Sequence, residues 1–510
     1  MPQNRNILFI VIDQLRADCL TGALSEHVDL PNLRRFMKEG VTFKQHFSVT
    51  SPCGPSRASL LTGQYAMNHR SVRNGTPLRH DTPNLATELR KSGYLPMLFG
   101  YTDTSVDPRV YPAEDPALKC LEYVMPGFHE MLEMRFEKSY PWLSHLAAQG
   151  YQFETRNDLY TPTSPVGRVP KLNDPALYKA QDSDTAFLTD AFLANSATRQ
   201  QGNWFTHLTY IRPHPPLVAP APYNTLYQPA ELPLPKRLQT RALEEQVHPF
   251  FGPMLRHTTP EKFVHGFPDL DQSDETVQTL RAIYLGLATE VDHHIGRVIS
   301  DLKSKGQYDD TLIIITADHG EMLGDRHAWG KMTVYEAAYN TPLIIKMPEN
   351  DARAGQEVVA PTESIDITPT ILDWIGREVP SSMDGRSLLP LLKGSLPSDW
   401  RSATFSELDF GDPVNPTLWQ TMLGTTLRES CLGILRDGRF TLVEFAADLP
   451  PLLFDHQANG EEENVAMQVE YASDLARMSR QMLRFRMQHT DQTLSSAAIT
   501  LDGVKWHRAH

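Results

Sequence analysis

The strongest constraint on the fold is a short run of apolar residues near the start of the chain, residues 7–12, which reads Ile-Leu-Phe-Ile-Val-Ile. Its continuity and β-branched content predict a strand buried on both faces, the pattern of a parallel sheet. Residues 312–316 and 342–346 are runs of the same kind. Apolar spacings of three and four over residues 33–39 and 277–302 predict helices. This alternation predicts an α/β fold with a large central, mainly parallel sheet flanked by helices.

The rest of the chain divides unevenly. Its 510 residues are enough for one large sheet domain and a small appendage. A break near residues 394–398 is followed by strand-like alternation over residues 430–446 and an amphipathic helical pattern over residues 474–488. We therefore expect a large domain over 1–395, a small C-terminal α+β domain over 396–490, and an extended tail over 491–510 that contacts other subunits. The Pro-rich stretch at 210–260 predicts a long surface excursion rather than regular structure.

Charge and composition exclude several classes of partner. Lys and Arg number 48 against 62 Asp and Glu, a formal net charge of −14, which disfavours nucleic acid and anionic lipid. An anionic substrate would need a local positive site instead. The four cysteines lack C-x-x-C spacing, so neither a zinc knuckle nor a disulfide framework is indicated. No apolar run resembles a signal peptide or a membrane span, which predicts a soluble, cytoplasmic protein with no membrane partner.

Two acidic dipeptides follow predicted strands. Asp13-Gln14 comes after the first run, and Asp318-His319 comes shortly after the run at 312–316. Each alone is equally compatible with a helix cap or a turn acid. Because ligands gather at the carboxyl ends of strands in open α/β sheets, the two together predict a divalent-metal site of oxygen ligands and one nitrogen.

The decisive stretch is Ser-Pro-Cys-Gly-Pro-Ser-Arg-Ala-Ser-Leu-Leu-Thr-Gly at residues 51–63. A lone cysteine such as Cys53 is often a buried structural thiol. Here Arg57 stands at the start of a predicted helix, which would place a cation and a helix N-terminus beside the sulfur. That arrangement suits a nucleophile acting on an anion.

The sequence from Cys53 to Arg57 resembles the C-x-P-S-R signature of the sulfatase family, part of the alkaline phosphatase superfamily. The resemblance covers nearly the whole chain. Its other motifs are Asp13-Gln14, Gly93-Tyr94 with Gly100, Arg212-Pro-His214, the stretch at 316–325, Trp329-Gly-Lys331 and the stretch at 366–370. It implies an alkaline phosphatase-like catalytic domain over 1–395. It also implies that a separate maturation enzyme oxidises Cys53 to formylglycine, the working nucleophile.

More narrowly, the chain is similar to the phosphonate monoester hydrolase branch and its arylsulfatase relatives. Most sulfatases carry Asp-Asp and Asp-Asn where this chain has its two dipeptides, and a Lys where it has Tyr101. By matching position, the resemblance implies that Asn74, Tyr101, His214 and Lys331 contact the substrate. Asp103 departs from the branch, which has Thr there. It either faces the substrate, where it would disfavour dianions most, or points away as a solvated acid or a partner of Arg109.

The resemblance also implies a mechanism. One divalent metal, calcium or manganese, would be held by Asp13, Gln14, Asp318, His319 and residue 53. The hydrated aldehyde at position 53 would attack sulfur or phosphorus, with Asp318 as proton acceptor. Arg57, the metal and Asn74 would hold the equatorial charge, and Lys331 and His214 would serve the leaving oxygen. Without the resemblance, His214 could be a loop histidine and Lys331 a surface lysine.

The resulting prediction is a formylglycine-dependent arylsulfatase with promiscuous phosphonate monoester and phosphodiester hydrolysis. One alternative makes phosphonate monoester hydrolysis the native activity. Another is a non-catalytic, metal-bound scaffold in which Cys53 is never converted. The predicted partners are a small anionic ester and the maturation enzyme, and the resemblance implies a homodimer or homotetramer.

Overall fold

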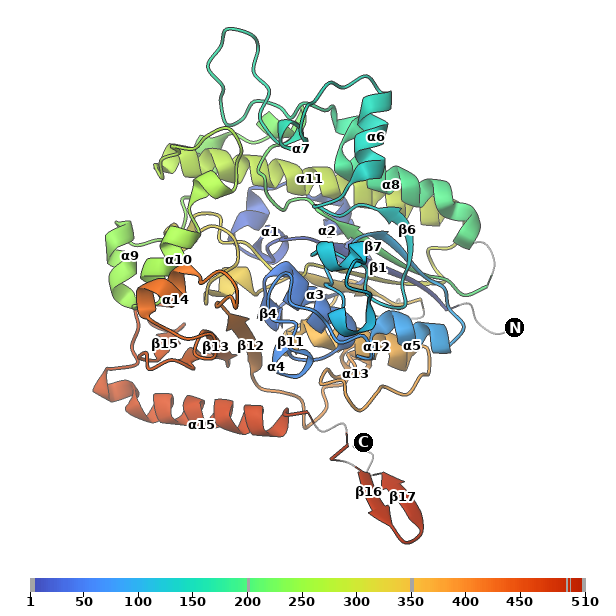
Figure 1. The fold of residues 1–510 in the computed structure, drawn as a ribbon, viewed down its shortest axis with the longest axis vertical. Helices are drawn as coiled ribbons and strands as arrows, with labels where there is room; N and C mark the ends of the chain where they lie inside the picture. The colour runs from blue at the N-terminus through green and yellow to red at the C-terminus, as the bar shows by residue number, and fades with distance from the viewer. Residues whose placement is uncertain (1–4, 200–201, 349–352, 492–493, 496, 507–510) are drawn as a thin grey trace.

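The computed structural model describes residues 5–199, 202–348, 353–491, 494–495 and 497–506. Its centre is an eight-stranded mixed sheet, shown in Figure 1. The strands run in the order β10 (Glu357–Val358), β2 (Val41–Phe43), β9 (Leu343–Lys346), β8 (Thr311–Thr316), β1 (Asn6–Ile12), β7 (Phe205–Tyr210), β5 (Pro96–Gly100) and β6 (His129–Glu133). The predicted α/β architecture is confirmed.

Most neighbouring strands are parallel, but β9 is antiparallel to both β8 and β2. The apolar run at 342–346 is therefore a strand, as predicted, while the parallel pairing expected of it is wrong. A continuous apolar run reports burial on both faces, and burial does not fix strand direction. β1 and β8 are fully buried parallel neighbours at the centre of the sheet.

Alternate side chains of β1 enter two different cores. Leu8, Ile10 and Ile12 pack in the core that includes α2 (Pro31–Glu39), α8 (Asp184–Ala194) and α11 (Asp274–Ser304). Ile7, Phe9 and Val11 pack in the opposite core with α3 (Cys53–Thr62), α5 (Leu85–Lys91) and α12 (Ile367–Trp374). Figure 1 shows these helices on the two sides of the sheet. Both predicted helices, at 33–39 and 277–302, lie within α2 and α11.

A second sheet has five strands in the order β15 (Leu452–Asp455), β14 (Phe440–Phe445), β13 (Cys431–Arg436), β12 (Thr404–Asp409) and β4 (Thr50–Ser51). The predicted strands at 430–446 are β13 and β14. The helix predicted at 474–488 is α15 (Ala472–Gln488), which packs Met478 and Met482 into the core of this sheet. β4 belongs to the N-terminal part of the chain and pairs in parallel with β12.

The Pro-rich stretch at 210–260 differs from its prediction. Leu217, Val218 and Ala219 are buried in the main core, and α9 (Arg241–Val247) and α10 (Phe251–His257) are regular helices. Apolar residues between the prolines favour burial of this segment over solvent exposure. The remaining elements are α1 (Asp18–Thr21), α4 (Ala66–His69), α6 (Tyr140–Ala148), α7 (Arg156–Leu159), α13 (Leu389–Leu392), α14 (Leu418–Leu423), β3 (His46–Phe47) and β11 (Thr362–Glu363).

The tail is a hairpin of β16 (Ala497–Thr500) and β17 (Gly503–Trp506), at the red end of the chain in Figure 1. The rest of the predicted tail at 492–493, 496 and 507–510 lies outside the described residues. Residues 1–4 also lie outside the described residues. They belong to the N-terminal stretch in which no signal peptide was expected. Within the described ranges, none of the helices has both the length and the apolar character needed to cross a bilayer.

Candidate active site

Cys53 is the first residue of α3, directly after the cap residue Pro52, and is 5% exposed. Two serine hydroxyls fix this end of the helix to the chain that follows β8. Ser51 donates to the carbonyl of Lys331 at 3.0 Å, and Ser56 donates to the carbonyl of Asp318 at 2.5 Å. The helix N-terminus is therefore held against the carboxyl ends of the central strands.

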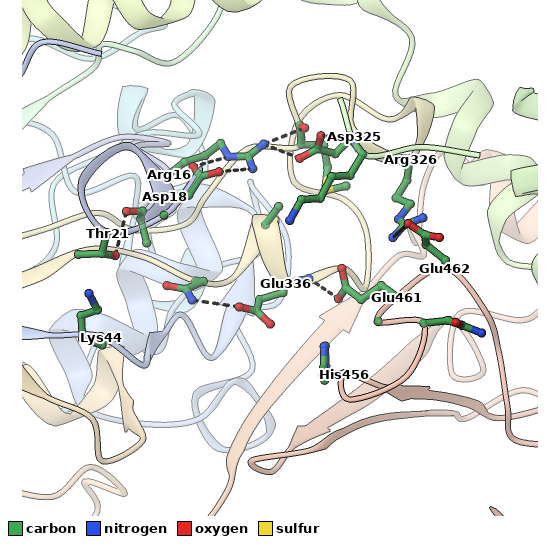
Figure 2. A pocket seen from close by; sticks show the side chains of 18 residues that line it. Arg16, Asp18, Thr21, Lys44, Asp325, Arg326, Glu336, His456, Glu461 and Glu462 are labelled. Carbon is green, nitrogen blue, oxygen red and sulfur yellow. Dashed lines mark hydrogen bonds and ion pairs between the residues drawn. The ribbon is translucent and has the colours of Figure 1, made fainter. Parts of the chain in front are cut away.

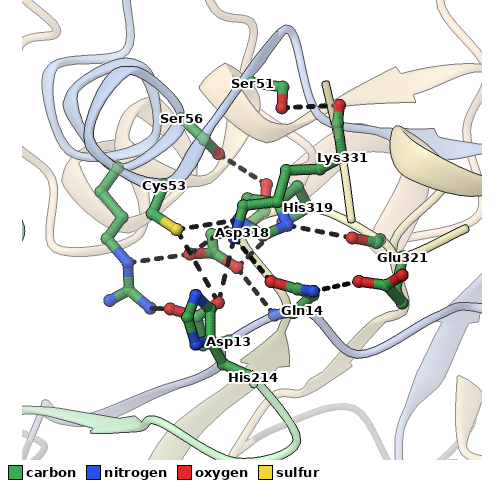
Figure 3. A network of polar contacts seen from close by, with 12 residues as sticks. Asp13, Gln14, Ser51, Cys53, Ser56, His214, Asp318, His319, Glu321 and Lys331 are labelled. Atoms are coloured by element: carbon green, nitrogen blue, oxygen red, sulfur yellow. Dashed lines mark hydrogen bonds and ion pairs between the residues drawn. The ribbon is translucent and has the colours of Figure 1, made fainter. Parts of the chain in front are cut away.

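The two acidic dipeptides meet at this point. Because β1 and β8 are parallel neighbours with Val11 opposite Thr316, the residues after each strand emerge side by side. Figure 3 shows the result: ligand atoms of Asp13, Cys53, Asp318 and His319 all lie within 4.8 Å of one another. All four are buried.

The imidazole of His319 is oriented to offer a lone pair to this cluster. Its Nδ1–H donates to the carbonyl of Gly320 at 3.0 Å, which leaves Nε2 unprotonated. Nε2 lies 3.8 Å from a carboxylate oxygen of Asp13 and 3.8 Å from one of Asp318. Burial is the main cause that lowers the pKa of His319 to about 4, so the ring is neutral at pH 7.

The side-chain amide of Gln14 is fixed by two hydrogen bonds, one from its nitrogen and one to its oxygen. Glu321 accepts a short hydrogen bond from the Gln14 amide nitrogen, while the Gln14 amide oxygen accepts from the Lys331 ammonium at 2.6 Å. Glu321 is itself fixed by backbone N–H groups of Leu323 and Gly330, at 3.0 and 2.5 Å. A buried carboxylate thus sets the direction of the Gln14 amide.

These donors fit a divalent cation. Two carboxylates, one amide oxygen and one neutral imidazole form a mixed oxygen and nitrogen set, and the carboxylates and imidazole converge on one small volume. The negative charges of Asp13 and Asp318 are offset by Arg57 and Lys331 and also favour a bound cation.

Arg57 bridges the two carboxylates. Its Nε donates to Asp318 at 2.9 Å and its Nη2 to Asp13 at 3.2 Å. Tyr101 adds to this bridge: its hydroxyl donates a short hydrogen bond to Asp13 and accepts from Arg57 Nη2 at 3.0 Å. Arg57 also stacks on the Tyr101 ring, 4.1 Å from its centroid, and donates to the hydroxyl of Thr209 at 2.7 Å. Arg57 is therefore engaged mainly with the carboxylates in this structure.

The two carboxyl groups differ in acidity. Burial and the charge of Asp318 raise the pKa of Asp13. Burial would also raise the pKa of Asp318, but His319 and Arg57 outweigh it, so the pKa of Asp318 is lowered. Asp318 thus stays ionised and is a weak proton acceptor.

The unmodified thiol is a poor nucleophile. Burial and the nearby Asp13 carboxylate, 4.0 Å from the sulfur, raise the pKa of Cys53 well above its usual range despite the opposing charge of Lys331. Arg57 is paired with Asp13 and Asp318, so its charge is not available to stabilise a thiolate at position 53.

The remaining predicted residues surround this cluster. Lys331 bonds to Gln14, and His214 faces the cluster from the loop after β7 (Figure 3). His214 donates from Nδ1 to the carbonyl of Pro215 at 2.6 Å, and burial and Lys331 hold its pKa well below 6.5. Asn74 accepts from the backbone N–H of Gly54 at 2.9 Å, next to the nucleophile position.

Asp103 is buried rather than exposed to solvent. It is 5% exposed, and within the described part of the chain its Oδ1 is buried without a hydrogen-bond partner. Arg109 pairs with Asp107 at 2.6 Å, so neither alternative position of Asp103 is found. Burial and Glu122 raise the pKa of Asp103.

Several contacts could not be assigned from the sequence. Glu321 contacts Gln14 through a short hydrogen bond from the Gln14 amide nitrogen. Asp325 instead pairs with Arg16 and Arg281 at 2.9 and 2.6 Å. His327 bonds to the carbonyl of Leu238 at 2.9 Å, away from the cluster. Phe136, 5.7 Å from the His214 ring, was missed because no motif surrounds it.

A cavity of about 580 Å³ is lined by other residues and not by those of this cluster (Figure 2). Its wall combines Arg16, Asp18 and Asp325 with residues of the C-terminal sheet region, among them Glu461. Arg16 is held by Asp18 at 2.7 Å and Asp325 at 2.9 Å. The charges around Arg16 are thus mutually paired, and the cavity contains no nucleophile comparable to residue 53.

The sequence was compared with protein-family models and with known proteins. The sulfatase family model matches residues 5–377, and a model for the C-terminal part of N-sulphoglucosamine sulphohydrolase matches residues 324–488. The chain is 39% identical over 98% of both sequences to the multifunctional alkaline phosphatase superfamily protein PehA of Trinickia caryophylli.

Two solved structures extend the comparison. The phosphonate monoester hydrolase SpPMH from Silicibacter pomeroyi is 65% identical, with 99% of each chain covered and a TM-score of 0.98. The phosphonate monoester hydrolase of Agrobacterium radiobacter is 38% identical, covering 99% of this chain and 100% of that chain, with a TM-score of 0.94. With its Cys53 signature held between two aspartates at the carboxyl edge of an alkaline phosphatase-like sheet, the chain belongs to the sulfatase family.

Proposed function

We propose that the protein is a formylglycine-dependent hydrolase of monoanionic esters, with phosphonate monoesters and phosphodiesters as its principal substrates and aryl sulfates as strong further ones. The observation that carries this proposal is the convergence of Asp13, Asp318 and His319 on residue 53. Similarity to two phosphonate monoester hydrolases over nearly the full chain supports the order of substrates. That order reverses the prediction from sequence, which placed sulfate first.

The chemistry of the site supports conversion of Cys53 to formylglycine. A thiol whose pKa is raised by burial and by Asp13 is mostly protonated at neutral pH, and a protonated thiol is a weak nucleophile. A hydrated aldehyde at the same position presents two hydroxyls, one to attack and one to expel the bound group. Since the side chain is 5% exposed, we infer that the maturation enzyme acts before this segment is packed.

Asp13, Gln14, Asp318 and His319 would hold the divalent metal, together with residue 53. When bound, a calcium or manganese ion would lower the pKa of the attacking hydroxyl and polarise a substrate oxygen. Arg57 holds both carboxylates in place and offsets their charge. Asp318 was expected to accept the proton of the nucleophile, but Arg57 and His319 reduce its basicity, whereas Asp13 has the raised pKa and lies 4.0 Å from the sulfur.

The leaving group would face Lys331 and His214. Lys331 is charged, because Cys53, Asp13 and Asp318 outweigh burial and raise its pKa. His214 is neutral in the free enzyme and would gain a proton only when an anionic substrate raises its pKa. Lys331 therefore offsets charge on the leaving oxygen, and His214 supplies or stabilises its proton.

Asp103, when ionised, would disfavour dianionic esters rather than select among monoanionic ones. Its carboxyl group lies close enough to residue 53 to raise the pKa there. Charge repulsion acts on a dianionic phosphate monoester about twice as strongly as on a monoanion. Sulfate monoesters, phosphonate monoesters and phosphodiesters are all monoanions, so each is tolerated.

The test compares kcat/KM on two aryl esters with the same leaving group, a sulfate monoester and a phenylphosphonate monoester. The enzyme is co-expressed with a formylglycine-generating enzyme, and conversion at position 53 is checked by mass spectrometry. A larger value for the phosphonate supports the proposal. A sulfate preference of about a hundredfold, or about 2.7 kcal/mol, would make arylsulfatase the native activity. No turnover of either ester by the converted protein would show that the enzyme requires a different leaving group and that aryl esters are not its substrates.

A further inference from the structure

The loop that carries His214 has few backbone N–H groups with which to bond its own carbonyl groups. It runs through Pro213, His214, Pro215 and Pro216, and proline has no backbone N–H to donate. The backbone N–H of His214 donates to the carbonyl of Ile211 at 2.9 Å. The carbonyls of this buried loop therefore need donors from elsewhere in the fold.

Arg212 supplies those donors. Its Nη1 donates to the carbonyl of His214 at 3.0 Å and to the carbonyl of Pro216 at 2.9 Å. One nitrogen atom thus holds the His214 backbone and the position two residues beyond it. The Arg212 side chain is fully buried, so it does not exchange these bonds for water.

Arg212 is in turn fixed by a second group of side chains. Its Nε donates to the carboxylate of Asp184 at 3.1 Å, and its Nη2 donates to the Tyr178 hydroxyl at 3.4 Å. Its guanidinium lies over the ring of Tyr160, 4.9 Å from the centroid. Asp184 begins α8, and its other oxygen accepts from the backbone N–H of Thr185 at 2.8 Å. The loop is thereby tied to a long buried helix.

We infer that the buried Arg212–Asp184 pair is a positioning element that sets the place of the His214 imidazole relative to the leaving group. This rests on the proposed function, because it takes His214 as the residue that serves the leaving oxygen. The His214 Nδ1–H is used by the carbonyl of Pro215, so only Nε2 remains for the substrate. A shift of the loop backbone moves Nε2 directly. Buried ion pairs are also a weak source of net stability compared with apolar residues of similar size.

The experiment measures kcat/KM for a series of aryl esters whose leaving phenols differ in pKa, with Asp184→Asn, Arg212→Lys and His214→Gln. A group that serves the leaving oxygen matters most for poor leaving groups. We expect Asp184→Asn and Arg212→Lys to slow the unsubstituted phenyl ester by about 10- to 100-fold and the dinitrophenyl ester by less than about threefold. In the double variant Asp184→Asn/His214→Gln, the loss should not exceed that of His214→Gln alone.

The chain offers a matched control at the opposite edge of the sheet. Arg199 is also buried, donates to the carbonyl of Phe192 at 2.8 Å, and pairs with Asp301 at 3.0 Å. Asp301→Asn should leave the dependence on leaving-group pKa unchanged. If Asp184→Asn instead slows all esters equally, or adds its full loss to that of His214→Gln, the pair is only structural and the inference fails. If His214→Gln itself shows no dependence on the leaving group while Cys53→Ala is inactive, the role of His214 fails but the proposed hydrolase stands.

Discussion

The Nε2 atom of His319 lies 3.1 Å from the sulfur of Cys53. The sulfur marks the position that the formylglycine hydroxyls would occupy, and the imidazole presents a lone pair to it because Nδ1–H is bonded to Gly320. The imidazole and residue 53 are therefore in direct contact. Under the proposed function, this contact would link metal binding to activation of the nucleophile.

The metal site is tested through His319. We expect His319→Ala to fold but to bind metal at well below one equivalent, and to lose activity as wild-type enzyme does after chelation. Metal at about 100 times its Kd should stabilise the wild type by about 2.7 kcal/mol. The measurements are metal content by mass spectrometry and Tm with and without manganese or calcium. His327→Ala, outside the cluster, is the control, and full metal content in His319→Ala would exclude this ligand.

Cys53→Ala should abolish turnover of both sulfate and phosphonate esters, by more than about 10⁴-fold, while Tm changes little. The loss follows because no other side chain in the cluster is a comparable nucleophile. Initial rates at high enzyme concentration measure the residual activity. Turnover within tenfold of wild type would contradict nucleophilic catalysis by residue 53.

Asp103→Thr should increase kcat/KM for a phosphate monoester on the order of tenfold relative to a sulfate monoester, since about 1.4 kcal/mol of repulsion is removed. The relative rate for two monoanions, sulfate and phosphonate, should change less. Asp81→Asn is a suitable control because Asp81 is exposed and pairs with Arg79. An equal effect on all three esters would show that Asp103 does not discriminate charge.

Stability should fall in acid partly through His69. Burial lowers the pKa of this imidazole to about 3, and its Nδ1 accepts from the backbone N–H of Ser71 while Nε2 bonds to Ser59. The unfolded state binds a proton near pH 6.5 and the folded state does not, so stability is lost as pH falls from about 6.5 towards 3, by up to about 1.4 kcal/mol per pH unit. His69→Gln should be less stable at pH 7.5 but show a shallower decrease of Tm from pH 6.5 to 5. Parallel curves would contradict this assignment.

The terminal hairpin is proposed to contact other subunits. Ile499 and Leu501 are 83% and 107% exposed at its tip, which is unusual for apolar side chains that remain in water. Truncation after Asp491 should lower the mass measured by light scattering from a dimer or tetramer to a smaller species. An unchanged mass would place the subunit contact elsewhere.

The sequence was most informative where burial and motif coincide. β1 and β8 were predictable because continuous apolar runs occur where both faces of a strand are covered, and that placed Asp13 and Asp318 at one edge. β7 was not predicted, because Thr206, His207 and Thr209 interrupt its apolar pattern, although all three are buried. Two-residue strands such as β4 carry no periodic signal at all.

Within the site, residue identity was predictable and its pairings were not. The motif indicated Arg57 but not that it would bridge Asp13 and Asp318, because side-chain direction depends on the crossing of α3 over the strands. The buried position of Asp103 likewise depends on a left-handed backbone, with φ of 49°. No residue pattern around it specifies that conformation.

The pairing of β4 with β12 sets an order of events during synthesis. Ser51, two residues before Cys53, pairs with Leu408, so this end of α3 cannot take its final place until the ribosome has made that distant strand. At about 5–20 residues per second, the interval lasts on the order of tens of seconds. Under the proposed function, the maturation enzyme would bind the cysteine segment during this interval. Completion of the C-terminal sheet would end that access, so the speed of translation would help to set the fraction of protein that becomes active.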